Sequence, residues 1–315
     1  MSLSVVIPTF NERDHLARCL DALAERTSQT EVIVVNAPST DGTSGMIHER
    51  DDVDMLLECA SRNINVARNA GIREATHPIV ALLGATCQVQ SGWQPTIQAN
   101  LSGAADAASG PIHPGDPRGD ATDRASDRGL GINGENVALT REAITALDGF
   151  DEYLSLGGTA DLATRLSGHG LNVMWHPEME VHRIMTADGG ESQRRNVGRQ
   201  FVWGSADPPD WGDRYRALAY RSVKNDGIRP RVLGRLLSWA IRDGVSAALE
   251  VFRGRGTPTQ WVGNGVDVVT NVLVGMRDGR NARSADGTTA RNPHGLSHER
   301  SIEAIADTHD WRRVP

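Results

Sequence analysis

The stretch that most constrains this chain is residues 4–12, Ser-Val-Val-Ile-Pro-Thr-Phe-Asn-Glu. The apolar run Val5–Ile7 is typical of a strand that is buried on both faces of a parallel sheet. Pro8 cannot donate to a sheet ladder, so the strand should end there. Apolar residues recur at helical spacing from about Glu12 onward, and Asn11 is the expected cap of that helix. A strand, a polar turn and a helix predict an α/β domain, and such domains bind ligands at the carboxyl ends of their strands.

The next segments repeat this order of strand and helix. Glu31–Asn36 predicts a second buried strand, and the polar loop 37–43 follows it, with Ser39 or Asp41 able to cap the next helix. Ile79–Leu83 predicts a further buried strand. Strands joined through a helix form βαβ units, so the first strands should lie in one parallel sheet.

Composition limits the kind of partner and compartment. The 315 residues are enough for one large domain or for a domain plus an appendage, and 39% hydrophobic with 23% charged residues is typical of a soluble globular protein. A net charge of −7 provides no pervasive basic field, so nucleic acid is not expected as a partner. The three cysteines follow no metal or disulfide spacing and favour a reducing, cytoplasmic compartment.

Membrane contact is expected to be peripheral. Residues 1–20 show no pattern of charged and then apolar residues that would indicate a signal peptide. No apolar run reaches the roughly 18 residues that a membrane-spanning helix needs. The expected location is therefore the cytoplasm, including the inner face of the cell membrane.

Four further stretches resemble segments of the same known protein family as the opening motif does. They are Ser39–Thr43 (Ser-Thr-Asp-Gly-Thr), Asn65–Ile72 with its Ala-Arg-Asn-Ala-Gly, Gly134–Ala143 and Gly149–Glu152. With residues 4–12, they resemble the family 2 glycosyltransferases over residues 1–185. The resemblance implies an α/β fold of GT-A type, with a mostly parallel central sheet flanked by helices, here followed by a C-terminal helical appendage. It also implies transfer of a hexose-type sugar from a nucleoside-diphosphate sugar to an acceptor hydroxyl, with inversion at the anomeric carbon.

The resemblance also implies which residues contact the nucleotide. They are Pro8, Thr9, Asn11, Glu12, Asn36, Asp41 and Arg68. Asn36 stands where the family has the aspartate that contacts the base, and its amide can accept one hydrogen bond and donate another. Arg68 either pairs with the diphosphate or lies on a solvated helix face.

The family's metal-binding motif is not matched. Its Asp-x-Asp should follow the strand at 79–83, but the chain reads Gly-Ala-Thr there. Mg²⁺ or Mn²⁺ would lack its acidic ligands at Gly84 and Thr86, and a soft thiol such as that of Cys87 does not replace them. No metal-binding residue is therefore predicted. Arg68, Arg183 or a helix N-terminus would have to steady the leaving diphosphate instead.

The family's catalytic base is not matched either. Gly158 and Thr159 occupy the positions of its Glu-Asp pair, and only the later Asp161 remains. Asp161 is therefore the candidate catalytic residue, and the alternative is that it stabilises the N-terminus of its own helix. His182 resembles a late histidine of the family that binds metal or phosphate, although an ordinary surface or core histidine would look the same.

The expected domains are a nucleotide-sugar-binding domain at 1–190, a helical appendage at 191–276 and a mostly flexible tail at 277–315. A short helix is expected in the tail near Ile302–Ala306. Within the first domain, 113–127 has little apolar periodicity and predicts a mobile loop that is either a lid or a surface insertion.

The appendage contains an amphipathic helix at 231–252 and a second, glycine-weakened one at 262–276. Apolar residues line one broad side of the first helix, and arginines lie off it. Such a helix either makes peripheral contact with an anionic membrane or packs against the catalytic domain. If it contacts the membrane, the acceptor would be a glycan or a lipid-linked glycan at the inner membrane face.

Two functions remain open from the sequence. The first is a glycosyltransferase without metal, and the second is a non-catalytic relative that binds a nucleotide sugar or scaffolds a partner glycosyltransferase. The gaps at 84–86 and 158–159 favour the second function, whereas the surrounding family motifs favour the first. A Rossmann-type dehydrogenase is not supported, because no Gly-x-Gly-x-x-Gly follows the first strand.

Overall fold

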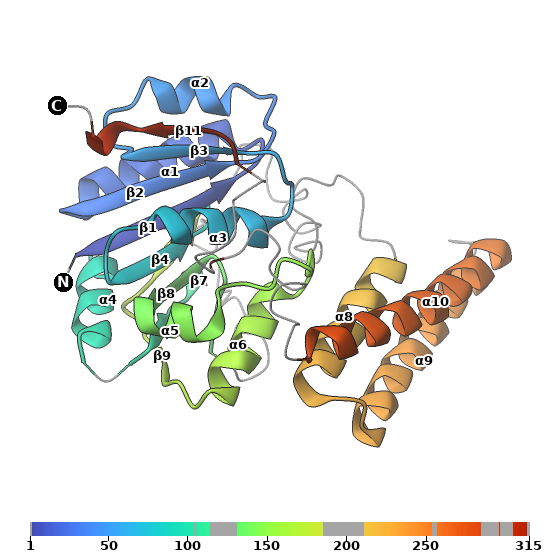
Figure 1. Ribbon diagram of the computed structural model, residues 1–315. Helices are drawn as coiled ribbons and strands as arrows, with labels where there is room; N and C mark the ends of the chain where they lie inside the picture. Colours follow the sequence, from blue (N-terminus) through green and yellow to red (C-terminus); the bar gives the residue numbers. More distant parts are fainter. Residues whose placement is uncertain are drawn as a thin grey trace. The chain divides into compact units, whose positions relative to one another are not determined.

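The chain divides into two compact units (Figure 1). Unit 1 comprises Met1–Glu152, Gly158–Gly204 and Asn292–Pro315, and unit 2 comprises Tyr153–Gly157 and Ser205–Arg291. The computed structural model describes residues 2–103, 105–113, 131–184, 211–253, 257–284, 296 and 305–313. The predicted loop at 113–127, apart from residue 113, therefore lies outside the described residues.

Unit 1 is built on an eight-stranded sheet with the order β11-β3-β2-β1-β4-β8-β6-β9. Its strands are β1 (Leu3–Thr9), β2 (Thr30–Asn36), β3 (Met55–Cys59), β4 (Ile79–Leu83), β6 (Ala107–Ser109), β8 (Asn136–Thr140), β9 (Val173–Trp175) and β11 (Ile305–Asp310). The β1–β2, β2–β3, β1–β4 and β6–β9 pairs are parallel, whereas β4–β8, β6–β8 and β3–β11 are antiparallel. The expected mostly parallel central sheet is confirmed.

Helices flank both faces of this sheet (Figure 1). They are α1 (Arg13–Arg26), α2 (Thr43–His48), α3 (Ile64–Glu74), α4 (Trp93–Leu101), α5 (Arg141–Leu147) and α6 (Gly158–Gly168). Val5 and Ile7 of β1 belong to the same buried cluster as α1 and α4, whereas Val6 belongs to the cluster that includes α3, α5 and α6. The continuous apolar run of β1 is thus buried on both sides, as the sequence predicts.

A small second sheet lies beyond the end of β4. It has the order β5-β10-β7, formed by β5 (Cys87–Val89), β10 (Val181–Arg183) and β7 (Ile112–His113). In the antiparallel β5–β10 pair, Arg183 lies opposite Cys87. The small sheet therefore brings Arg183 next to the residues that follow β4.

The first helix begins one residue later than expected. α1 starts at Arg13, and Asn11 does not cap it but adopts a left-handed backbone with φ of 51°. The side-chain oxygen of Asn11 instead accepts a hydrogen bond of 2.8 Å from the Thr40 amide. The prediction of an Asn11 cap is therefore wrong, because this side chain joins two loops.

Unit 2 contains the helices α8 (Trp211–Asp226), α9 (Pro230–Phe252) and α10 (Pro258–Ala282). Its core consists of Ala219, Val223, Val232 and Leu236. Two of the glycines in α10 allow close packing on α8, since a Cβ at Gly275 would lie 2.3 Å from the Arg216 carbonyl oxygen and one at Gly279 would lie 2.5 Å from that of Tyr220. Within the described ranges, no helix is both long and apolar enough to cross a bilayer.

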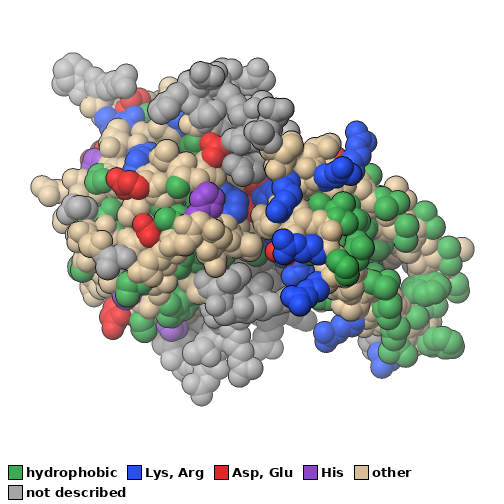
Figure 2. Space-filling view, turned by 60° about the horizontal axis from the view of Figure 1, so that its bottom comes forward, with side chains coloured by type: hydrophobic (Ala, Val, Ile, Leu, Met, Phe, Trp, Pro, Cys, Tyr) green, Lys and Arg blue, Asp and Glu red, His purple; other side chains and the backbone are tan. Residues whose placement is uncertain are grey.

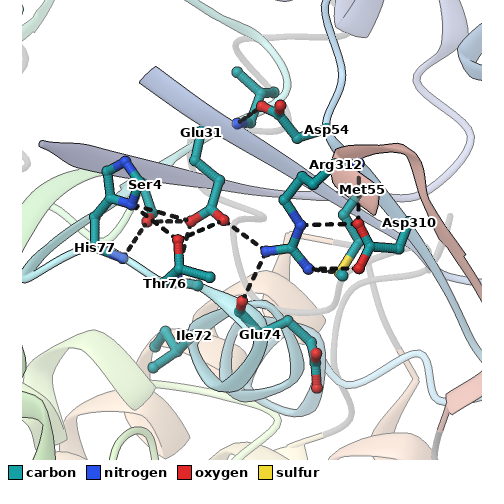
Figure 3. A network of polar contacts seen from close by, with 12 residues as sticks. Ser4, Glu31, Asp54, Met55, Ile72, Glu74, Thr76, His77, Asp310 and Arg312 are labelled. Atoms are coloured by element: carbon teal, nitrogen blue, oxygen red, sulfur yellow. Dashed lines mark hydrogen bonds and ion pairs between the residues drawn. The ribbon is translucent and has the colours of Figure 1, made fainter. Parts of the chain in front are cut away.

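The prediction for the tail is wrong in its described parts. α10 continues to Ala282, and Ile305–Asp310 forms β11, antiparallel to β3, where a short helix was expected. Arg312 then reaches Glu31 at 2.6 Å and Asp310 at 2.9 Å (Figure 3). Because β11 is polar, its residues show little apolar pattern, and the strand depends on its pairing with β3 and on these ion pairs.

Candidate functional site

The loops that follow β1 and β2 are joined to each other at the carboxyl edge of the sheet. Besides the contact between Asn11 and Thr40, the Asn11 amide donates to the Ser39 hydroxyl at 2.9 Å, and the Arg13 amide donates to the Asp41 carboxylate at 2.9 Å. Burial alone would raise the pKa of Asp41, but hydrogen bonds from Thr43 and the Arg13 amide hold it below its usual value. The structure thus brings two of the family-like stretches together.

Three further residues predicted to contact the nucleotide lie at this edge. Pro8 pairs in register with Val35 and Thr9 with Asn36. The Asn36 side chain is buried, donates to Ser44 and Glu58 at 2.9 and 3.1 Å, and accepts from the Ser39 hydroxyl at 2.7 Å. The buried Thr9 hydroxyl has no partner among the described residues. Asn36 therefore acts in this structure as a support for the loops, and its contact with a base stays a prediction.

Arg68 is buried in α3 and does not lie on a solvated helix face. Its guanidinium donates to the Gly134 carbonyl at 2.9 Å and to the Asn65 side chain at 3.1 Å, and lies 4.9 Å from the centre of the Phe150 ring. Burial lowers the pKa of Arg68 to about 10, so it is still charged at neutral pH. These contacts hold α3 against the 134–150 region, and pairing with a diphosphate stays a prediction.

A charged cluster lies at the end of β4, where the sequence analysis finds no acidic residue. Arg183 donates to the Glu135 carboxylate at 2.6 Å and to the Thr86 hydroxyl at 3.1 Å. Glu135 was not predicted, although it lies in the family-like stretch 134–143. No local pattern indicates it, because only the pairing of β8 with β4 brings the Glu135 carbonyl oxygen within 3.0 Å of the Gly84 amide nitrogen.

Glu12 completes this cluster. Burial, together with the nearby carboxylates of Glu135 and Asp41, raises the pKa of Glu12 to about 8, against a smaller opposite effect of Arg183. Glu12 is therefore mostly protonated at neutral pH. The ion pair of the cluster is the one between Glu135 and Arg183, at 2.6 Å.

The residues at the end of β4 do not fit the divalent metal that the family implies. A Cβ at Gly84 would lie 3.0 Å from the Glu135 Cβ and 3.3 Å from the Cys87 sulfur, so an acidic side chain there would have to push these neighbours aside. The Thr86 hydroxyl is engaged by Arg183, and burial raises the pKa of the Cys87 thiol to about 12. Among the described residues, no group of three or more His, Cys, Asp or Glu side chains could hold a metal.

The position of the family's base is also filled by a neighbour. A Cβ at Gly158 would lie 2.3 Å from the Asn65 side-chain nitrogen. Asp161 is completely buried and forms an ion pair of 2.8 Å with Arg165, which also donates to the Leu147 carbonyl at 2.7 Å. This placement agrees with the structural alternative for Asp161, and its role as a base stays a prediction.

Comparisons with known proteins place these observations in a family. Residues 4–148 match the model of Glycosyl transferase family 2. The glycosyltransferase AglE of Haloferax volcanii is 26% identical over 191 residues, which is 54% of this chain and 63% of that protein. The uncharacterized glycosyltransferase YibD of Escherichia coli K12 is 35% identical over 91 residues, or 28% of this chain and 26% of that protein. The chain thus spans less than two thirds of these relatives.

Two solved structures share the fold. The mannosyltransferase PcManGT of Pyrobaculum calidifontis, in complex with GDP-Man and Mn²⁺, aligns with a TM-score of 0.52 and 18% identity, covering 90% of this chain and 86% of its own. Residues 1–349 of TarS from S. aureus, in complex with UDP-GlcNAc, align with a TM-score of 0.62 and 14% identity, covering 93% and 92%. At these identities the similarity concerns the fold, which is the GT-A fold that the sequence predicts.

Proposed function

Because the N-terminal part of this chain, residues 4–148, belongs to the family 2 glycosyltransferases, we propose that the protein transfers a sugar from a nucleoside-diphosphate sugar to an acceptor hydroxyl. The observation that carries this proposal is the joining of the loops after β1 and β2 next to the charged cluster of Glu12, Glu135 and Arg183. Ligands of open α/β sheets bind at this edge. The two structural neighbours were solved with GDP-Man and UDP-GlcNAc, which supports a donor of this class.

The proposed reaction is an inverting displacement of the hexosyl type. The acceptor oxygen attacks the anomeric carbon, and the bond from that carbon to the diphosphate oxygen breaks with both electrons leaving on the oxygen. The proton of the acceptor hydroxyl passes to a base, for which Asp161 is the family-position candidate. Since Asp161 is paired with Arg165 inside the protein, this assignment requires the ion pair to open.

Donor turnover tests the proposal directly. Purified full-length protein is incubated with UDP- and GDP-linked hexoses, and release of the nucleoside diphosphate is measured with and without an acceptor extract. We expect release from at least one donor. If no tested donor is turned over by folded protein, the catalytic proposal fails.

We further propose that unit 2 makes peripheral contact with an anionic membrane, where a lipid-linked or cell-surface glycan would be the acceptor. Large apolar side chains are exposed along α9 at spacings of three and four residues: Leu233, Leu237, Ile241, Val245, Leu249 and Phe252. α10 continues this surface with Trp261, Val262, Val266, Val269 and Leu273. Figure 2 shows hydrophobic side chains gathered in one area, with Lys and Arg side chains beside them. Such a large exposed apolar surface is typical of an interaction site.

An apolar groove of about 550 Å³ adds support for a lipid-linked acceptor. It is lined by small residues of α9, including Ala240, Gly244 and Ala247, and by Val262 and Val266 of α10.

Flotation with vesicles of anionic or zwitterionic lipid tests the membrane contact. We expect binding to anionic vesicles that is lost in Leu237→Gln/Ile241→Gln and weakened in Arg242→Gln, and equal recovery of all variants without lipid is the control. Absence of vesicle binding by the unsubstituted protein would contradict the proposal.

The alternative is a non-catalytic protein that binds a nucleotide sugar or scaffolds a partner glycosyltransferase. The observation that favours it is the filling of both family positions, at Gly84 by Glu135 and at Gly158 by Asn65. Calorimetric titration with UDP and GDP separates the two functions when it is combined with the turnover assay. Binding of a nucleoside diphosphate without turnover of any donor would favour the alternative.

A further inference from the structure

Arg183 reaches the end of β4 from a different sheet. β10 pairs with β5, and this places the Arg183 guanidinium on the Thr86 hydroxyl at 3.1 Å and on the Glu135 carboxylate at 2.6 Å. Its side chain is 15% exposed, and that of Glu135 is 30% exposed. The guanidinium is therefore held in one place by strand pairing and two contacts, while the ion pair keeps some access to solvent.

The residues around Arg183 favour an arginine side chain over a bound metal ion as the cation at this place. Thr86 occupies a family metal-ligand position, and its hydroxyl accepts from Arg183. Glu135 packs against Gly84, the other family metal-ligand position. Both positions are thus taken up by the Glu135–Arg183 pair.

We propose that Arg183 is the cation that binds the donor's diphosphate and does the work for which related enzymes use a divalent metal. This inference rests on the proposed function. An arginine presents five N–H donors in a planar fork that matches phosphate oxygens, and its charge does not depend on pH in the physiological range. When the bond from the anomeric carbon to the diphosphate oxygen breaks, the electron pair stays on that oxygen, and the guanidinium stabilises the added charge.

The charges around Arg183 are compatible with an incoming anion. The carboxylates that act on this cluster are Glu135, Glu12 and Asp41. Among the residues that the structure describes, Glu135 is the carboxylate paired with the guanidinium, at 2.6 Å, and a diphosphate would have to displace it. In the absence of a donor, the Glu135–Arg183 pair keeps the arginine in position.

Nucleotide binding with UDP, GDP, UMP and GMP tests this inference, by calorimetry in parallel titrations with EDTA and, in its place, with Mn²⁺. We expect UDP or GDP to bind in EDTA, and the affinity in Mn²⁺ to differ less than twofold. We expect Arg183→Ala to weaken binding of that diphosphate at least tenfold, while binding of the matching monophosphate changes less than twofold. Arg183→Lys, which retains the charge without the fork, should fall in between. Arg18→Ala, on the exposed side of α1, is the matched control and should behave as the unsubstituted protein.

Thermal melting of each variant separates loss of binding from loss of folding. The inference is overturned if EDTA abolishes diphosphate binding, if folded Arg183→Ala keeps its diphosphate affinity, or if it loses the monophosphate equally. None of these outcomes overturns the proposed function, because that function is decided by donor turnover. If the unsubstituted protein binds neither UDP nor GDP and turns over no donor, both the inference and the proposed function fail.

Discussion

The end of β4 and the start of α6 are the two regions where the chain departs from the family 2 glycosyltransferases that it resembles, and neighbouring side chains fill them differently. At Gly84 the neighbour is Glu135, which is partly exposed and paired with Arg183. At Gly158 the neighbour is the buried amide of Asn65, and the nearby ion pair of Asp161 with Arg165 is closed to solvent. The first region keeps accessible charge, whereas the second has become part of the core. We infer that the end of β4, which is proposed to bind the leaving diphosphate, keeps a usable charged site. The start of α6, which is proposed to serve the acceptor, keeps less of one.

The largest effect is expected from Asp161→Asn. Removing one partner of a buried ion pair leaves the other charge without compensation, which costs about 3–5 kcal/mol of unfolding free energy. We expect chemical denaturation to show this loss, and Asp161→Asn/Arg165→Met to recover part of it. Donor turnover per folded molecule should also be lost, because Asp161 is the proposed base. Unchanged turnover per folded molecule would remove the base assignment, and unchanged stability would break the comparison.

The pH dependence of stability should come from the first region. The pKa of Glu12 is about 8 in the folded protein and has a usual value of 4.5, so the folded state binds this proton more tightly than the unfolded state. Its contribution to stability is therefore present below pH 4.5 and is lost as the pH rises from 4.5 to 8. The unfolding free energy, measured from pH 5 to 9, should decrease by at most about 1.4 kcal/mol per pH unit in this window. Glu12→Gln should show a flatter profile, and an identical profile would contradict the assignment.

Adding one methyl group at each glycine compares the two regions directly. At Gly158 the new Cβ would approach the Asn65 nitrogen to 2.3 Å, and Asn65 is held by hydrogen bonds to Asp151 and Arg68. We expect Gly158→Ala to lose about 1–3 kcal/mol of unfolding free energy. Gly84→Ala should lose less, because its contacts with Glu135 begin at 3.0 Å. Equal losses in thermal or chemical denaturation would show that the two regions are equally rigid.

The smallest effect is expected from Glu135→Gln. Loss of the carboxylate frees Arg183 from its ion pair and removes a competitor of the diphosphate. We expect affinity for UDP or GDP to rise about two- to fivefold, which corresponds to an ion pair worth less than about 1 kcal/mol. Calorimetry measures this change, and Glu142→Gln on α5 serves as the control. A fall in affinity would indicate that Glu135 itself contributes to binding.

Local patterns predicted the elements with a clear apolar signature. β1, β2 and β4 were recognisable as short continuous apolar runs, and α9 was recognisable because its apolar residues recur at helical spacing. The cluster around Arg183 was not predictable, because Glu135 and Thr86 meet only through the pairing of β4 with β8, and that pairing joins segments about fifty residues apart. The structural role of Asp161 did have a local signal, since Arg165 follows four residues later on the same helix.

The last described strand links the order of synthesis to the folding of unit 1. β11 follows α8, α9 and α10 in the chain, yet it completes the sheet that begins with β1. Until β11 is made, the edge of β3 stays open, and the buried Glu31 carboxylate lacks the guanidinium of Arg312. A ribosome must therefore release the helices of unit 2 before unit 1 can close, so truncations that spare every site residue should still expose an aggregation-prone edge.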